Sequence, residues 1–101
     1  MDKANAQADQ GVQLSGFLRC ATDDEVAIVA EHLPRHIELT RAELGCLSFE
    51  VIQTEDPRVW SVEEWFTGSD AFRAHQARVI ASEWGRATQG IERDYAIVGL
   101  E

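Results

Sequence analysis

The sequence predicts an α+β domain built around a four-stranded antiparallel sheet. Segments in which apolar and polar residues alternate predict strands, and segments with apolar residues at helical spacing predict helices. The two kinds follow one another in the order β-α-β-β-α-β. The chain has 101 residues, of which 45% are hydrophobic and 27% charged. A chain of this size and composition is typical of one globular domain.

The N-terminal part predicts a tail followed by a strand. Residues 1–11 are small and polar without apolar periodicity, so we expect a mobile tail there and one domain over residues 12–101. Val12 to Cys20 places alternate apolar residues on one side, which predicts the first strand.

A long first helix is predicted next. Thr22 followed by Glu25 matches a capping box at its start, and Gly45 is expected at its end. Pro34 lies inside this stretch and predicts a kink, or two helical pieces that share an apolar face. That face contains Val26, Val29, Leu33, Ile37, Thr40 and Leu44.

The second half of the chain predicts a hairpin, a helix and a last strand. Residues 47–53 and 59–66 are the two strands of the hairpin, and the second is rich in β-branched and aromatic residues. Residues 71–88 are helical in composition, with Gly85 as a weak point. Residues 94–100 alternate again and predict the final strand.

This order with right-handed crossovers gives a ferredoxin-like fold, with both helices on one face of the sheet. The other face is left uncovered, although it carries Phe17 and either Trp60 or Trp65. We therefore expect a homodimer joined through these sheet faces. Cys20 and Cys46 fall at opposite ends of two parallel strands, so both are expected to be free thiols.

The charge of the chain excludes several partners. Eighteen acidic residues against nine basic ones give a net charge of −9, which disfavours nucleic acid. No apolar run is long enough to cross a membrane, and the N-terminus lacks the apolar stretch of a signal peptide. We therefore expect a cytoplasmic protein without a membrane partner.

Three segments of the chain resemble successive signatures of a known family. They are AELGCLSFEV at residues 42–51, VEEW at 62–65 and AFRAH at 71–75. In this order they resemble the antibiotic biosynthesis monooxygenase (ABM) family over about residues 12–100. The resemblance implies a dimeric ferredoxin-like α+β barrel. It also implies one of the family's activities, which include quinol or polyketide oxygenation without a cofactor, haem degradation and the processing of a signal molecule.

Oxygenation without a cofactor requires a base, an aromatic wall and a group that stabilises an anion, because a deprotonated quinol or phenol itself reduces oxygen. His75 is expected at the edge of an apolar helical stripe, partly buried and titratable, and is our candidate base. Glu63 and Trp65 share one face of their strand, and the helix that follows is expected to bring His75 near that face. Phe72 lies one turn before His75 in the same helix. These three are candidate substrate contacts. The structural alternatives are packing for His75, core or dimer interface for Trp65, and an anchoring hydrogen bond for Glu63.

Two further polar residues on the first helix are candidate substrate contacts. His32 and His36 stand four apart, a spacing that suits metal ligation, but only His36 borders the apolar stripe. We therefore expect no metal, and His36 is a candidate hydrogen-bonding residue of the pocket. Arg41 is a candidate for holding an anionic substrate, and pairing with Glu38 or Glu43 is its structural alternative.

Two departures from the family narrow the expected chemistry. The only asparagine is Asn5, so the asparagine-dependent mechanism of some polyketide-oxidising relatives is not expected. Residues 78–84 offer no histidine in the region where haem-degrading relatives have their axial ligand, so haem is not expected. The sequence also has no phosphate-cradling glycine loop and no convincing metal-ligand cluster, so no other cofactor is expected. The predicted function is a cofactor-free monooxygenase acting on a quinol-like or polyketide-like aromatic. The alternatives are an isomerase-like enzyme that uses the same pocket and a non-catalytic dimeric binding or stress protein.

Overall fold

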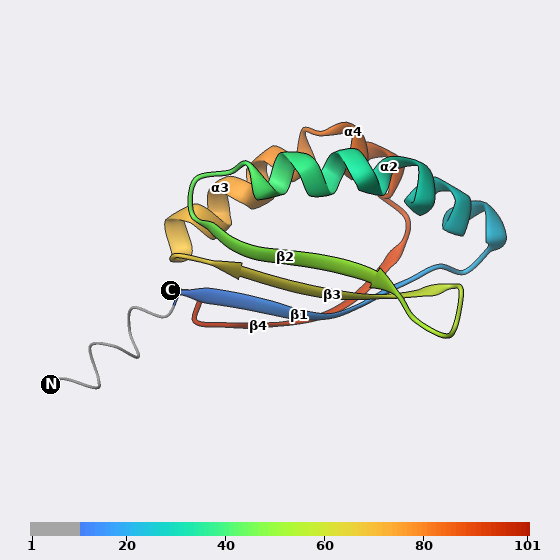
Figure 1. The fold of residues 1–101 in the computed structure, drawn as a ribbon, viewed down its shortest axis with the longest axis horizontal. Coiled ribbons are helices and arrows are strands. Elements are labelled where there is room, and N and C mark those ends of the chain that lie inside the picture. Colours follow the sequence, from blue (N-terminus) through green and yellow to red (C-terminus); the bar gives the residue numbers. More distant parts are fainter. Residues whose placement is uncertain (1–10) are drawn as a thin grey trace, which may run out of the picture.

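The computed structural model describes residues 11–101, so residues 1–10 of the expected tail lie outside the described residues. The elements are β1 (Val12–Arg19), α2 (Asp23–Arg41), β2 (Cys46–Gln53), β3 (Val59–Phe66), α3 (Ser69–Ile80), α4 (Glu83–Ala87) and β4 (Glu92–Val98). The strands form one sheet in the order β2-β3-β1-β4, and every neighbouring pair is antiparallel. All three helices lie on one face of this sheet (Figure 1). The predicted ferredoxin-like α+β fold is therefore confirmed.

The start of α2 follows the capping pattern that the sequence predicts. The backbone N–H of Glu25 donates to the Thr22 hydroxyl at 3.1 Å. The helix continues through Pro34 to Arg41, and it buries Val29, Leu33, His36 and Thr40. Leu44 is 97% exposed, so its predicted place on the apolar face is wrong. The reason is that the helix ends three residues earlier, which removes Leu44 from the helical periodicity.

The predicted helix over residues 71–88 is two helices in the structure, with the break between Ile80 and Glu83. Ser82 makes the break, because its hydroxyl donates to the carbonyl of Val79 at 2.6 Å and accepts from the N–H of Gly85 at 3.0 Å. A side chain at Gly85 would collide with the same carbonyl. The glycine therefore lets α4 turn back closely against the end of α3.

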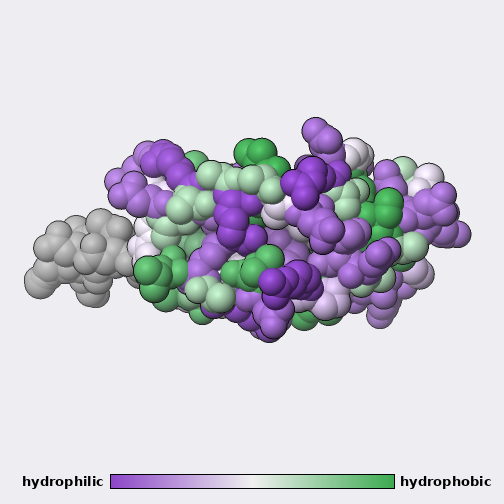
Figure 2. All heavy atoms as spheres, turned by 90° about the horizontal axis from the view of Figure 1, so that it is seen from above, coloured by the Kyte–Doolittle hydropathy of each residue, from purple (hydrophilic) through white to green (hydrophobic). Residues whose placement is uncertain are grey.

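The alternation along β3 separates two sets of side chains. Trp60, Val62, Glu64 and Phe66 are buried beneath the helices. Glu63 and Trp65 point to the opposite face, where Trp65 is 37% exposed and Phe17 of β1 is 38% exposed. Of the two tryptophans considered for the uncovered face, Trp65 is thus the one that lies there. The helix side of the molecule is mostly hydrophilic, with scattered apolar side chains (Figure 2).

Cys20 and Cys46 are both free, as predicted from their positions in the strand order. Within residues 11–101, no helix combines the length and the apolar character needed to cross a membrane.

Candidate active site

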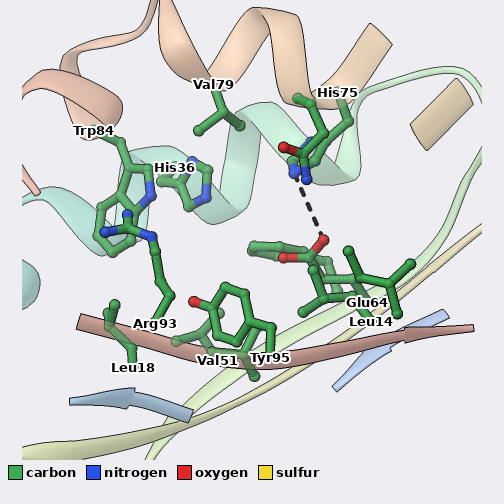
Figure 3. Close-up of a pocket in the computed structure, with 14 residues that line it drawn as sticks. Leu14, Leu18, His36, Val51, Glu64, His75, Val79, Trp84, Arg93 and Tyr95 are labelled. Atoms are coloured by element: carbon green, nitrogen blue, oxygen red, sulfur yellow. Dashed lines mark ion pairs between the residues drawn. The ribbon is translucent and has the colours of Figure 1, made fainter. Parts of the chain in front are cut away.

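A cavity of about 260 Å³ lies between the inner face of the sheet and the helices (Figure 3). All four strands contribute to it, together with α2, α3 and α4. Its wall is mainly aliphatic and aromatic, with a few polar side chains, as is usual for sites that bind small molecules. The lining residues are Leu14, Leu18, His36, Phe49, Val51, Val62, Glu64, His75, Gln76, Val79, Trp84, Arg93, Tyr95 and Ile97.

His75 enters the cavity from the inner face of α3. Only 4% of its surface is exposed, so it is buried rather than at the partly exposed edge that the sequence suggests. Its Nδ1 lies 3.0 Å from a carboxylate oxygen of Glu43, in the turn that follows α2. Glu43 is held in turn by the guanidinium of Arg78, which also donates to the hydroxyl of Thr40.

Burial decides the charge of His75, and the contact with Glu43 decides which ring nitrogen carries the proton. Burial lowers the pKa of the imidazole, and this effect outweighs the attraction of the carboxylate. The ring is therefore neutral at neutral pH. With its proton on Nδ1, donated to Glu43, its Nε2 carries a free lone pair on the cavity side.

Glu64 projects from β3 into the cavity because it lies on the buried side of the strand alternation. Its Oε1 is 3.7 Å from Nε2 of His75 and accepts no hydrogen bond from any described residue. The dashed line in Figure 3 marks this ion pair. Burial, and secondarily the charge of Glu43, raises the pKa of this carboxyl from 4.5 to about 7. A carboxyl with a pKa near neutral pH and a neutral imidazole thus face one another inside the cavity.

His36 and Trp84 form another part of the wall. Their rings are stacked with centroids 4.4 Å apart and planes within 4° of parallel. Burial lowers the pKa of His36 to about 3, so this imidazole stays neutral. Its Nδ1 finds no hydrogen-bond partner among the described residues.

The remaining polar groups come from β4. Arg93 lines the cavity with a guanidinium that is fixed by donation to the backbone carbonyls of Thr88 and Ile91. Burial raises the pKa of Tyr95 to about 12, so its phenol remains a neutral hydrogen-bonding group. Apart from His75 and Glu64, the wall of the cavity is therefore uncharged except for the Arg93 guanidinium.

The structure brings together two of the six predicted site residues, His75 and His36, whose ring centroids are 6.3 Å apart. Glu63 and Trp65 do share a strand face, but it is the outer face, so the expectation that the helix brings His75 near them is wrong. The sheet itself separates them, because α3 packs on the inner face.

Two more of the predicted residues lie outside the cavity lining. Phe72 is buried against Phe66, with ring centroids 5.7 Å apart, and packs in the core. Arg41 donates to the carbonyl of Phe49 and to the carboxylate of Glu50, rather than to Glu38 or Glu43 as considered from the sequence.

Sequence reasoning missed Glu64, Glu43, Trp84, Arg93 and Tyr95 as residues of this site. A signal for Glu64 was present, because the period of two places it on the same side as Val62 and Phe66. Trp84 reaches the cavity only because α4 turns back at Ser82, which periodicity along one continuous helix does not show. Over residues 11–101, no group of three or more histidine, cysteine or acidic residues has the arrangement to hold a metal ion.

Fold and site together define a small α+β protein with an aromatic-lined cavity and a buried carboxyl–imidazole pair, a class suited to a small organic ligand. A sequence profile of the family described as antibiotic biosynthesis monooxygenase (ABM) matches residues 12–86. The chain belongs to the ABM family.

Solved structures share the fold at low sequence identity. A conserved protein from Methanosarcina mazei is 17% identical, with a TM-score of 0.66 over 92% of this chain and 93% of that one. A Mycobacterium tuberculosis protein is 20% identical, with a TM-score of 0.63 over 86% and 89%. A structure described as an antibiotic biosynthesis monooxygenase is 18% identical, with a TM-score of 0.64 over 86% and 93%. No curated protein sequence matches the chain. At these identities the likeness establishes the fold alone.

Proposed function

We propose that the protein is a cofactor-independent monooxygenase that oxygenates a small quinol-like or polyketide-like aromatic in the cavity between sheet and helices. The observation that carries this proposal is the pair formed by His75 and Glu64, with Nε2 and Oε1 3.7 Å apart in an aromatic-lined cavity. Membership of the ABM family supports it.

The size of the cavity suits such a substrate. An engineered cavity of about 150 Å³ accommodates benzene. A cavity of about 260 Å³ therefore has room for a small aromatic with substituents or a second ring. Phe49, Trp84 and Tyr95 supply ring surfaces against which a planar molecule packs.

The chemistry needs little from the protein beyond proton transfer and exclusion of water. An electron-rich phenol loses its hydroxyl proton, and the phenolate transfers an electron to O₂. The carbon para to the oxygen then forms a C–O bond, and loss of its hydrogen with cleavage of the O–O bond yields a para-quinone and water. One phenol and one O₂ thus give one quinone and one H₂O. The pair formed by His75 and Glu64 is the proposed base, and the fixed guanidinium of Arg93 favours the phenolate.

The same acid-base pair is also suited to a non-oxidative isomerisation, since such a reaction needs a proton removed and returned at one place. This second candidate consumes no oxygen. A non-catalytic binding protein would do neither reaction.

We also propose a homodimer that covers the outer face of the sheet. The apolar side chains that support it are Phe17, Ile52, Trp65 and Val98, all at least 37% exposed on the described part of the chain. Two free thiols agree with the reducing cytoplasm that we propose as its location.

The test is oxygen consumption by the purified chain with a panel of electron-rich phenols and quinols, without added flavin, haem or metal. The proposal expects turnover by the colourless protein and its loss in His75→Ala. The matched control is His32→Ala, which removes a histidine that does not line the cavity. Turnover of a substrate without oxygen uptake would favour the isomerase, and binding without any turnover would favour the non-catalytic protein.

A further inference from the structure

Three titratable side chains form a continuous chain from the cavity to the surface. Glu64 lines the cavity and lies 3.7 Å from Nε2 of His75, whose Nδ1 lies 3.0 Å from Glu43. Glu43 is 15% exposed and is paired with Arg78, which is 30% exposed. The two carboxylates thus contact opposite nitrogens of one imidazole.

We propose that Glu64, His75 and Glu43 act as one proton store, in which Glu64 takes and holds the substrate's proton beside Nε2 of the neutral His75, whose ring Glu43 positions. This inference rests on the proposed function for the identity of the substrate, a phenol or quinol. It assigns to Glu64 direct contact with the substrate and to Glu43 a positioning role that acts through His75.

The position of Glu64 singles it out as the first acceptor. Its carboxylate points into the cavity, and its Oε1 has no hydrogen-bond donor among the described residues that would compete with His75. His75 is only 4% exposed, and its second nitrogen is already engaged by Glu43. A phenol in the cavity therefore meets the carboxylate together with the imidazole rather than an isolated histidine.

The proton balance of the reaction closes within this unit. The O–H bond of the phenol breaks and an O–H bond forms on Glu64, whose new hydroxyl lies beside Nε2 of the neutral His75. The carboxyl holds the proton there, while the phenolate remains with the guanidinium of Arg93. When the O–O bond of the peroxide intermediate breaks, the stored proton returns from Glu64 to the departing oxygen, which leaves as water. The ring's own hydrogen supplies the second proton of that water.

The net charge of the proton store depends on Glu64 and on the groups next to it. Before the reaction the unit carries two carboxylates, a neutral imidazole and the Arg78 guanidinium, a net charge of −1. After proton uptake this charge is zero, so the phenolate is not opposed by excess negative charge nearby. Charged and titratable groups face the Glu64 carboxyl from several elements. They are His36 of α2, Glu43 of the turn after α2, His75 and Arg78 of α3, and Arg93 and Tyr95 of β4.

The first experiment uses the purified chain and a ligand that does not undergo oxygenation. 4-Nitrophenol is electron-poor, and its phenolate absorbs visible light, so its ionisation in the cavity can be titrated without turnover. We expect the bound probe in Glu64→Gln to ionise at a pH at least one unit lower than in the wild type, a tenfold change in its ionisation constant, because the neutral amide neither opposes the phenolate's charge nor releases a competing proton. Glu43→Gln should shift the ionisation in the same direction by a smaller amount. Glu55→Gln, in an exposed loop, is the matched control and should leave it unchanged.

A second measurement needs no ligand. Infrared spectroscopy of the free protein should show a protonated-carboxyl band that titrates near neutral pH, is absent from Glu64→Gln and is retained in Glu55→Gln. In Glu43→Gln the band should titrate at lower pH, because removing a neighbouring negative charge weakens proton binding by the whole unit.

The outcomes separate this inference from the proposed function. A band that is unchanged in Glu43→Gln, or a bound probe that ionises alike in wild type and Glu64→Gln, would overturn the proton store even if oxygen uptake is found. Both shifts without oxygen uptake by any phenol would keep the proton store and overturn the oxygenase.

Discussion

Glu63 and Glu64 are neighbours in β3, yet they lie on opposite faces of one sheet. Glu63 is exposed on the outer face, beside Trp65. Glu64 is 9% exposed beneath the helices, and burial raises the pKa of its carboxyl to about 7. Two identical side chains thus acquire different chemistry from one step of the strand alternation.

The comparison shows that the two faces of the sheet give their side chains different environments, one buried beneath helices and one exposed. The inner face, covered by helices, provides a region of low polarity that raises the pKa of the Glu64 carboxyl and lowers that of the His75 imidazole. The outer face presents exposed apolar side chains, among them Phe17 and Trp65, and is the face through which we propose the dimer forms. The predictions below test this difference, beginning with the largest effect.

The largest effect is expected from removing the imidazole of the inner face. His75→Ala should lower the rate of oxygen uptake about 10²- to 10⁴-fold, since this is the usual loss when a general base is removed. The change should be in kcat and should persist at saturating phenol. A loss of only a few-fold would indicate packing damage and would remove His75 from proton transfer.

The next effect concerns stability, and its sign follows from the raised pKa of Glu64. The unfolded chain releases this proton near pH 4.5 and the folded chain near 7, so the folded state binds more protons in between. The stabilisation is complete below pH 4.5 and is lost as the pH rises through 7. Relative to wild type, Glu64→Gln should therefore gain about 3 kcal/mol in unfolding free energy between pH 4 and pH 9.

Urea unfolding at fixed protein concentration measures this gain. The matched variant is Glu63→Gln, which makes the same chemical change on the outer face and should show no pH-dependent gain. Equal gains in the two variants would contradict the difference between the two faces.

The rate of oxygen uptake by the wild-type protein should also depend on pH. The pKa of Glu64 is about 7, and its carboxylate is the form that accepts a proton. The rate should therefore rise about tenfold per pH unit below 7 and level off above it. A rate that is flat between pH 5 and 8 would exclude this group from the rate-determining proton transfer.

The smallest effect is expected on the outer face. Trp65→Phe should weaken dimerisation several-fold in sedimentation experiments and leave the affinity for the phenol unchanged, because the ring lies on the opposite side of the sheet from the cavity. A wild-type protein that sediments as a monomer at micromolar concentration would contradict the dimer itself, because such an interface should bury well over ~1,000 Å².

The sequence was sufficient for the order of elements, because local signals agree with the fold. Thr22 begins α2 as its capping pattern predicts, and the β3 strand has the predicted bounds of Val59 and Phe66. The helix break at Ser82 escaped prediction, because it depends on a hydroxyl that bonds the backbone and on a close approach at Gly85.

The site was harder to predict than the fold. His75 and His36 were found because each lies near an apolar helical stripe. Glu63 was predicted as a site residue instead of Glu64, its neighbour in the strand. A charged residue such as Glu64 is usually expected on the solvent side of a strand, so its burial is hard to predict. The raised pKa that makes it useful is a property of the assembled layers, in which His75 and Glu43 arrive from elements distant in sequence.

The most direct test of the inner face as an oxygenase site is the fate of oxygen-18 gas. Purified protein, an electron-rich phenol and labelled O₂ are combined without added cofactor, and the product is analysed by mass spectrometry. The account predicts one labelled oxygen atom in the quinone, the other in water, and no hydrogen peroxide. An unlabelled product, or no oxygen consumed with any phenol or quinol, would contradict it.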